Sequence, residues 1–213
     1  MSKVRVQMMM SLDGYIAGPN QTAEKPFGED AESLVTWFHG LKAFHEIYGL
    51  EGGADSPSND VVREGFVNVG ATLMGRNMFG GGPGPDKAWE GWWGDNPPFH
   101  TPVFVLTHYA REPLVMEGGT TFYFVTDGIE SALAQAKAAA GEADVRIGGG
   151  GDTVNQYLAA GLVDEIELHL VPTLLGKGRR LFAGLEHARP ALDLVRVVSA
   201  DNVTHLKYRV INS

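Results

Sequence analysis

The sequence of 213 residues contains no cysteine, which excludes disulfide bridges and thiolate metal sites and is compatible with a reducing compartment. Basic residues are also few: 17 Lys and Arg stand against 26 Asp and Glu, a net charge of −9. General nucleic-acid binding needs a basic face and is disfavoured. No apolar run is long enough to span a bilayer, and the N-terminal residues lack the apolar core and cleavage site of a signal peptide. We expect a soluble, cytoplasmic protein.

No internal repeat and no interdomain linker stands out along the chain. With 44% hydrophobic and 20% charged residues, the composition is that of an ordinary globular protein. We therefore predict a single domain over residues 1–213.

The most informative stretch is rich in glycine. Residues 145–147 are typical of a buried strand, glycines occupy positions 148–151, and a helical spacing of apolar residues begins at Val154. This order brings bare backbone N–H groups to the positive end of a helix dipole, which predicts a seat for the pyrophosphate of a dinucleotide. A ligand-free flexible turn is the alternative. The carboxylate of Asp152 would repel a phosphate, whereas the hydroxyl of Thr153 could donate to one.

The hydrophobic pattern predicts strands and helices in alternation. Strands are expected over residues 3–10, 67–74, 101–108, 120–125, 143–147, 163–171, 192–200 and 203–211. Helices are expected over residues 30–48, 129–140 with Asp127 as its cap, and from the glycines to residue 161; residues 61–66 are compatible with a short helix. The pattern predicts an α/β fold with one largely parallel sheet and an antiparallel C-terminal hairpin.

Polar clusters follow four of these strands. They are Ser11-Leu12-Asp13-Gly14, Gly75-Arg76-Asn77, Thr107-His108 and Gly148 to Thr153. If the strands are parallel, all four clusters open on one edge of the sheet, where such sheets bind ligands. Arg76 could present its guanidinium fork to a phosphate there, or could be a surface arginine.

Several loops have more than one interpretation. Residues 49–59 are a candidate flap, and the basic loop 176–180 could meet a substrate phosphate or be solvated. Residues 80–98 hold three tryptophans and predict an insertion loop with a short helix. Its indoles could close over a flat ring, fill a dimer contact or form an interaction surface. His39 and His45 are not spaced for a shared metal, and we predict no metal site.

Taken together, the ordered motifs resemble the dihydrofolate reductase superfamily, most nearly the reductase domain of the bifunctional deaminase–reductase of riboflavin biosynthesis and its stand-alone bacterial relatives. The resemblance covers nearly the whole chain. It rests on Ser11 to Ala17, Leu73 to Phe79, Val103 to Thr107, Gly148 to Gly150, Gly161 to Ile166 and Pro172 to Gly176. It implies the three-layer fold of that superfamily, with a mostly parallel sheet.

The resemblance also implies an NADPH-dependent reductase and a homodimer. The residues it assigns to the cofactor are Ile16 and Ala17 beside the nicotinamide, Gly75, Arg76 and Asn77 at the phosphates, Thr107 and His108 near the 2′-phosphate, and Gly148, Gly149, Gly150, Gly151 and Thr153 at the pyrophosphate. The chain lacks the zinc signature of the deaminase, so the activity implied is that of a 5-amino-6-(5-phosphoribosylamino)uracil reductase or a similar enzyme. The substrate stays open among a pyrimidine, a pterin and another small carbonyl or imine.

The proton that accompanies hydride transfer must come from a carboxylic acid or from water. Asp13 is our candidate catalytic residue, with Asp30, Glu32 and water as alternatives, and Asp13 could equally cap its own turn. A non-catalytic nucleotide- or pterin-binding module of the same fold is the alternative to an enzyme.

Overall fold

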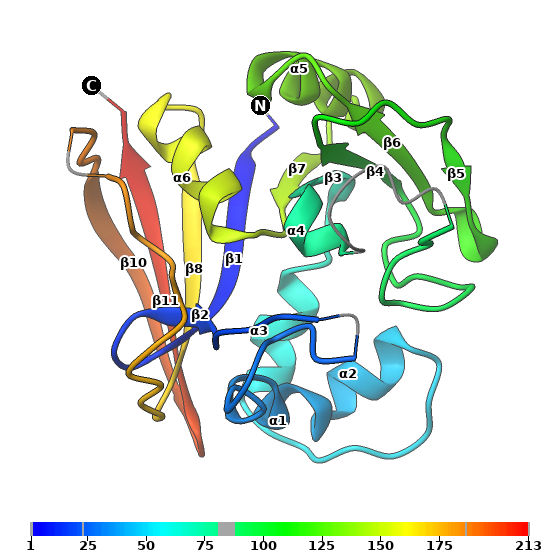
Figure 1. Ribbon diagram of the computed structural model, residues 1–213. Coiled ribbons are helices and arrows are strands. Elements are labelled where there is room, and N and C mark those ends of the chain that lie inside the picture. The colour runs from blue at the N-terminus through cyan, green and yellow to red at the C-terminus, as the bar shows by residue number, and fades with distance from the viewer. Residues whose placement is uncertain (1, 23, 81–87, 186, 213) are drawn as a thin grey trace.

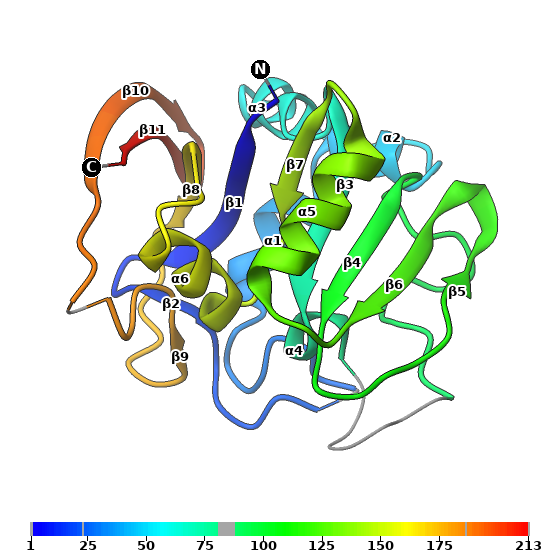
Figure 2. The same ribbon diagram turned by 90° about the horizontal axis from the view of Figure 1, so that it is seen from above.

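The fold is built on a twisted nine-stranded sheet with strand order β10-β11-β8-β1-β7-β3-β4-β6-β5 (Figures 1 and 2). The computed structural model describes residues 2–22, 24–80, 88–185 and 187–212. The strands of this sheet are β1 (Val4–Ser11), β3 (Val69–Gly75), β4 (Pro102–Leu106), β5 (Leu114–Val115), β6 (Thr121–Val125), β7 (Asp144–Ile147), β8 (Glu165–Val171), β10 (Ala191–Ala200) and β11 (Val203–Ile211). A small second sheet pairs β2 (Tyr15–Ala17) with β9 (Arg179–Arg180).

The six central strands are parallel, as the alternating pattern predicts. β8, β1, β7, β3, β4 and β6 pair in parallel register, while β10 and β11 form the antiparallel C-terminal hairpin. The hairpin joins the sheet through antiparallel pairing of β11 with β8. The predicted α/β class, the mostly parallel sheet and the terminal hairpin are all confirmed.

Helices cover both faces of the sheet and make three layers. On one face lie α5 (Ile129–Ala140) and α6 (Gly151–Ala159), whose apolar sides pack on alternate residues of the strands, among them Val4, Val6, Leu73 and Ile147. On the other face lie α1 (Ser33–His39), α2 (Lys42–Ile47) and α3 (Ser58–Glu64), which Figure 1 shows below the sheet. The layering follows from period-2 alternation, because each buried strand must hide both of its faces. Within the described part of the chain, no helix is long and apolar enough to cross a membrane.

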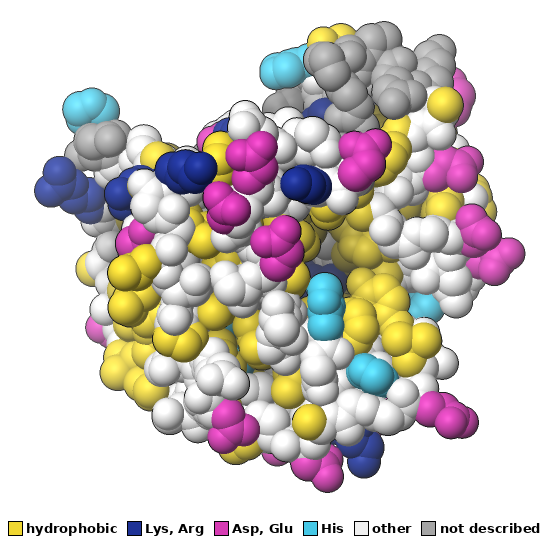
Figure 3. Space-filling model, turned by 60° about the horizontal axis from the view of Figure 1, so that its bottom comes forward, with side chains coloured by type: hydrophobic (Ala, Val, Ile, Leu, Met, Phe, Trp, Pro, Cys, Tyr) yellow, Lys and Arg dark blue, Asp and Glu magenta, His cyan; other side chains and the backbone are white. Residues whose placement is uncertain are grey.

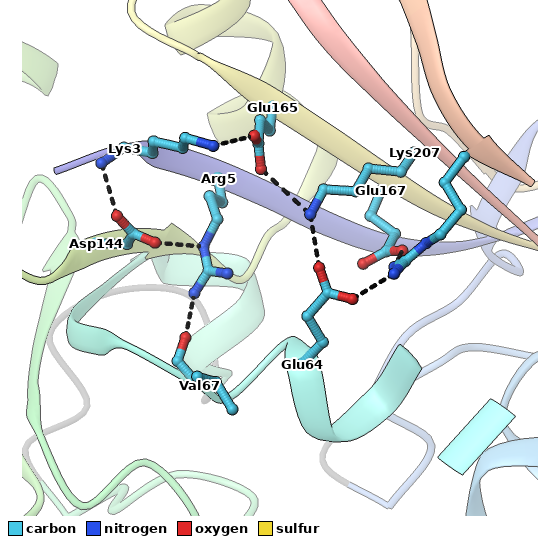
Figure 4. Close-up of polar contacts among 9 residues, drawn as sticks. Lys3, Arg5, Glu64, Val67, Asp144, Glu165, Glu167 and Lys207 are labelled. Carbon is cyan, nitrogen blue, oxygen red and sulfur yellow. Dashed lines mark hydrogen bonds and ion pairs between the residues drawn. The ribbon is translucent and has the colours of Figure 1, made fainter. Parts of the chain in front are cut away.

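The face under α3 is unusually charged. Glu64 at the end of α3 accepts hydrogen bonds from Arg196 (2.5 Å) on β10 and Lys207 (2.8 Å) on β11. Lys207 also lies 3.4 Å from Glu165 of β8 (Figure 4). These ion pairs tie α3 to the sheet where an apolar contact would otherwise be expected.

Two predicted features of the secondary structure are wrong, and a third is tested only in part. The helix expected over residues 30–48 is two helices, because α1 ends at His39 with Gly40 as its C-cap, and the extended backbone of Leu41 pairs with Ala54 of the following loop. Gly128, not Asp127, is the N-cap of α5, and the Asp127 carboxylate instead accepts the Ser131 hydroxyl at 2.8 Å. No helix lies in residues 88–98, and residues 81–87 of the same predicted loop are outside the described residues.

Candidate active site

The polar clusters that follow β1, β3, β4 and β7 lie at one edge of the sheet, because those strands are parallel. In Figure 2 this edge is at the bottom, where β2, β9 and α4 (Arg76–Phe79) also lie. The convergence expected from the sequence is therefore confirmed. Residues separated by more than a hundred positions, such as Asp13 and Thr153, share this edge.

The glycine cluster joins β7 to α6 and is bonded to the end of β3. The Gly75 N–H donates to the Gly149 carbonyl at 2.8 Å, and the Gly148 N–H donates to the Leu73 carbonyl at 2.9 Å. The peptide bond between Gly149 and Gly150 is cis, and Gly149 has a φ of +118°. These contacts hold the turn against the end of β3.

The start of α6 is open to a ligand. A Cβ built on Gly150, the N-cap residue, meets no atom within 4 Å. Backbone N–H groups of the first helical turn have no partner inside the helix and, with the helix dipole, suit an anion. The carboxylate of Asp152, which would oppose such an anion, lies 3.2 Å from the guanidinium of Arg179. The residues present therefore fit a diphosphate group.

Gly75 and Thr153 are in direct contact across this turn. A Cβ on Gly75 would lie 2.3 Å from the Thr153 hydroxyl oxygen, well inside contact distance. Thr153 is buried, so the side chain has little room to move away. A glycine at position 75 is what allows the end of β3 and the first turn of α6 to meet.

Arg76 and Asn77 continue from Gly75 into the short helix α4. Arg76 is half-buried, with its guanidinium carbon 5.9 Å from the ring of Phe79, whereas Asn77 is exposed. Arg76 is therefore a neighbour of the glycine turn and not a remote surface residue. Position 76 and the turn lie on the same side of the molecule.

Ile16 and Ala17 reach the edge through the small sheet of β2 and β9. A Cβ on Gly151 would come within 3.1 Å of the Ile16 side chain, which places β2 against the start of α6. On the other side of β2, a Cβ on Gly178 would lie 2.1 Å from the Ala17 carbonyl oxygen, and Gly178 has a φ of +122°. The basic loop 176–180 is exposed along its length, as expected of a solvated loop, while the pairing of β9 and the close approach of Gly178 hold it against β2.

Thr107 and His108 follow β4, two strands away from β7. Thr107 is buried, its N–H donates to the Val125 carbonyl at 3.0 Å, and its hydroxyl accepts the Tyr109 N–H at 3.1 Å. His108 is exposed. The Thr107 hydroxyl can still donate its proton to a ligand. Thr107 and His108 lie two strands from the glycine turn, at the far end of the sheet edge predicted to hold the cofactor.

The carboxylate of Asp13 is fully engaged in holding the loop between β8 and β9. It accepts hydrogen bonds from the Ser11 hydroxyl at 2.6 Å, the Gly176 N–H at 2.7 Å and the Leu175 N–H at 3.1 Å. The bond from Ser11 first, then those from the two amides, lowers the pKa of Asp13 to about 2 despite the opposing effect of desolvation. Such a group carries no proton near neutral pH. The geometry favours the anchoring role that the sequence left open.

The other two candidate acids point into solvent. Asp30 and Glu32 are both exposed, and Asp30 lies 3.6 Å from Lys177. Neither is placed against the glycine turn by any described contact. No three His, Cys, Asp or Glu side chains gather as they would around a metal ion in the described ranges.

The tryptophans of loop 80–98 pack inward. The indole N–H of Trp89 donates to the Phe79 carbonyl at 2.8 Å, and that of Trp92 donates to the Met78 carbonyl at 2.9 Å. Trp93 packs into the aromatic cluster of β4 and β6. These rings anchor the loop to α4, which supports the end of β3, and the indole N–H groups of Trp89 and Trp92 are satisfied within the chain.

One buried side chain was missed by the sequence reasoning. Arg146 lies in the strand that precedes the glycines, and only its place as a cation in an otherwise apolar run could have drawn attention to it. In the structure it is 8% exposed, and its Nε has no hydrogen-bond partner among the described residues.

Comparisons with known proteins agree with this geometry. A family model described as the RibD C-terminal domain matches residues 2–206. No curated protein matches the chain. Among solved structures, a protein assigned to riboflavin biosynthesis from Shewanella sp. PV-4 is 25% identical, with 98% of this chain and 99% of that chain covered and a TM-score of 0.67.

Two further structures are more distant in sequence. RibD of Acinetobacter baumannii is 17% identical with a TM-score of 0.59, and 99% of this chain covers 58% of that one. Dihydrofolate reductase of Enterococcus faecalis, solved with NADP(H), is 15% identical with a TM-score of 0.53, covering 98% of this chain and 96% of that one. These likenesses show the dihydrofolate reductase-like fold.

Proposed function

Because the chain belongs to the RibD C-terminal domain family, a reductase family, we propose that it is an NADPH-dependent reductase of a small heterocyclic, carbonyl or imine substrate. The observation that carries this proposal is the contact between the end of β3 and the start of α6, where Gly75 bonds to Gly149. It sets Arg76, the glycine turn and the N-terminus of α6 side by side, as a coenzyme diphosphate requires.

The chain's own residues supply binding and orientation. When bound, NADPH would provide the hydride, and the protein must hold an electron-poor C=N or C=O bond against it. We assign the diphosphate to the N–H groups at Gly150 and Gly151 with the Thr153 hydroxyl, and the 2′-phosphate to Thr107 and His108. Backbone groups of Ile16 and Ala17 would hold the nicotinamide, with β2 fixed by the anchored carboxylate of Asp13.

Replacing Arg76 with alanine is expected to weaken NADPH binding by roughly 10- to 100-fold, the range of one or two hydrogen bonds to a charged group. NADH binding should fall by a similar factor, because the diphosphate beside which Arg76 is placed is common to both nucleotides. Fluorescence titration of both nucleotides measures the two losses, and Arg76→Lys is the charge-preserving comparison.

Indifference of the wild-type chain to both nucleotides in calorimetry would remove the proposed function. Binding of NADPH without consumption across pterins, pyrimidines and small aldehydes would instead support the non-catalytic module. The pH dependence of the turnover rate would also test the proton source, which we assign to water. A titration between pH 5 and 8 in this pH–rate profile that Asp13→Asn abolishes would restore Asp13 as the donor.

We also propose that the protein is a homodimer formed through β10. This strand is one edge of the sheet and exposes Leu194 and Val197, which are 59% and 51% accessible, together with Leu192 and Val195. An apolar edge strand invites pairing with a second copy. The tryptophan loop is a poorer candidate, since its rings pack within the chain.

Leu194→Glu is expected to convert the dimer to a monomer, because it places a charge in the middle of the proposed contact. Sedimentation velocity measures the change. Val115→Glu is the matched control, since Val115 is an exposed apolar residue on the opposite edge strand β5. A wild-type chain that sediments as a monomer, or an equal effect of both variants, would contradict this interface.

A further inference from the structure

Residues 41–66 form a connected unit within the helical layer, which we call the α2–α3 flap. The guanidinium of Arg63 on α3 donates to both carboxylate oxygens of Glu46 on α2, at 2.8 and 2.9 Å. The Asn59 side chain of α3 accepts the Ala43 N–H in the first turn of α2 at 2.8 Å. The two helices also share an apolar cluster, whose members are Trp37, Phe38, Leu41, Ala43, Phe44, Ile47, Val62 and Phe66. None of these residues belongs to a strand, so the flap has apolar packing of its own.

Polar contacts join α3 to the strands at both of its ends. At its start, the Ser58 hydroxyl oxygen lies 2.9 Å from Nε2 of His205 on β11. At its end, Glu64 accepts hydrogen bonds from cationic side chains of β10 and β11 (Figure 4). Just beyond, the ring centre of Phe66 lies 4.3 Å from the guanidinium carbon of Arg146 on β7. Water can hydrate both sides of such contacts when they separate, so they open at lower cost than an apolar interface does.

The interface beneath the end of α3 is not fully packed. A cavity of about 20 Å³ lies there, lined by Glu64 and Gly65 of the flap and by charged side chains of the strands, among them Arg146 and Glu167. A water needs roughly 10–15 Å³ of such space, so the cavity has room for one. The buried Nε atoms of Arg146 and Arg196 have no hydrogen-bond partner among the described residues. Protein interiors seldom leave such voids and unpaired donors, so the flap is held less firmly here than a core helix is.

The chain is anchored on either side of the flap. Trp37 of α1 packs in the flap's apolar cluster and also in the cluster that joins α1 to β8 and β11. Past the flap, the Val67 and Asn68 carbonyls accept hydrogen bonds from an arginine of β1 and from the backbone of β7, both at 2.8 Å. Between these anchors, Gly40 is the C-cap of α1 and Gly65 is the C-cap of α3. Element-terminal residues of this kind serve as hinges in moving segments.

Figure 3 shows the molecule hollowed on the side where Figure 1 has α1 to α3, with hydrophobic side chains along one wall and histidines near the rim. We propose that the α2–α3 flap swings away from the sheet as one unit and acts as a lid on this hollow, with the Glu64 ion pairs holding it closed. Opening separates Phe66 from Arg146, which is 8% exposed while the flap is closed. The lid is a property of the free chain and goes beyond the reductase function proposed above.

Native-state hydrogen exchange of the ligand-free chain, followed by mass spectrometry, tests the proposal. Amides of α2 and α3 should exchange together and faster than those of β1 and β7, because the flap opens while the sheet stays folded. Glu64→Gln is expected to accelerate exchange in both helices about fivefold, the upper range for a partly exposed ion pair. Sodium chloride at about 1 M should accelerate the wild type similarly and the variant little, because salt screens the same ion pairs. Asp152→Asn is the matched control, since it breaks the ion pair with Arg179 on another part of the surface and should leave α2 and α3 unchanged.

Acceleration confined to the last turn of α3 would indicate fraying and would overturn opening as one unit. Exchange of α2 and α3 only together with the core strands, or an equal effect of Asp152→Asn, would overturn it as well. Ser58→Ala repeats the test from the other end of α3 and covers the case in which Glu64→Gln folds poorly. It too should accelerate exchange throughout α2, and no effect there would contradict the flap.

Arginine labelling by phenylglyoxal gives a second measurement. Arg146 lies under Phe66 and should react only when the flap is open, so its labelling rate should rise with the exchange rate in Glu64→Gln and not in Asp152→Asn. An unchanged rate in Glu64→Gln would refute the flap as the cover of Arg146. Neither measurement uses a nucleotide, so a chain that binds no NADPH would refute the reductase and leave the flap standing.

Discussion

Acidification from pH 6.5 to pH 5 is expected to lower the free energy of unfolding steeply, because two buried histidines cannot take up protons in the folded state. His169 of β8 and His205 of β11 face each other with their Nδ1 atoms 2.6 Å apart, and His205 Nε2 lies 2.9 Å from the hydroxyl oxygen of Ser58. The ring of Trp37 lies 5.3 Å from that of His169 and covers the pair. One Nδ1 must donate and the other accept, so at least one of the two rings is neutral as bonded.

Burial is the main cause of the lowered pKa values in this pair, about 3 for His169 and about 4 for His205, with the two rings and Arg196 adding repulsion. An unfolded histidine titrates near 6.5. The folded pKa values are depressed, so the unfolded chain binds more protons below pH 6.5. The stabilisation is complete above that pH and is lost as the pH falls toward 4 and below. Two such groups give a slope of up to about 2.7 kcal/mol per pH unit between pH 6.5 and 5.

His169→Asn removes one of the two protons that are taken up on unfolding, so it is expected to reduce the slope by roughly 1.4 kcal/mol per pH unit. Its amide group stays near the former Nδ1 position as a hydrogen-bond partner for His205. Chemical denaturation at several pH values measures it. His187 is exposed, and His187→Gln serves as the control that should leave the slope unchanged. An undiminished slope in His169→Asn would mean that other groups cause the acid sensitivity.

Replacing Gly75 with alanine is expected to weaken NADPH binding by about 100-fold, because moving the first turn of α6 removes hydrogen bonds to the charged diphosphate. The added Cβ would lie 2.3 Å from the hydroxyl oxygen of Thr153, so the first turn of α6 must move. Overpacking of this kind also lowers stability by roughly 1–3 kcal/mol. The backbone at Gly75, with φ −82° and ψ 159°, suits alanine, so contact with Thr153 is the sole cause.

A second substitution separates stability from binding in this test. Thr153→Ala removes the clashing oxygen and leaves its Cβ at 3.5 Å from the new methyl group, so it should restore stability to Gly75→Ala. Thr153→Ser keeps the oxygen and should not. NADPH affinity should remain weak in the rescued double variant if Thr153 donates to the diphosphate. Thermal unfolding and fluorescence titration report the two quantities. A single variant Gly75→Ala that is as stable as wild type would contradict the contact.

Residue order alone predicted most of the architecture, because period-2 and helical spacing are local properties. The C-terminal hairpin, the parallel core and helix α5 with its stop at Gly141 were all predictable in this way. The break at Gly40 was not. The apolar stripe continues through it, and Leu41 becomes extended because Ala54, distant in sequence, offers it a partner.

The same division holds for the candidate site. Motifs at strand ends predicted that four polar clusters share one edge of the sheet, because the carboxyl ends of parallel strands meet at the same edge. Only the tertiary structure placed Arg179 beside Asp152, engaged Asp13 with the backbone of residues 175 and 176, and turned the tryptophan loop inward. Only the tertiary structure shows that, within the described part of the chain, the Nε of the buried Arg146 has no hydrogen-bond partner. Sequence spacing determines which residues share an element, whereas the charge and burial around a side chain depend on neighbours that folding brings from elsewhere in the chain.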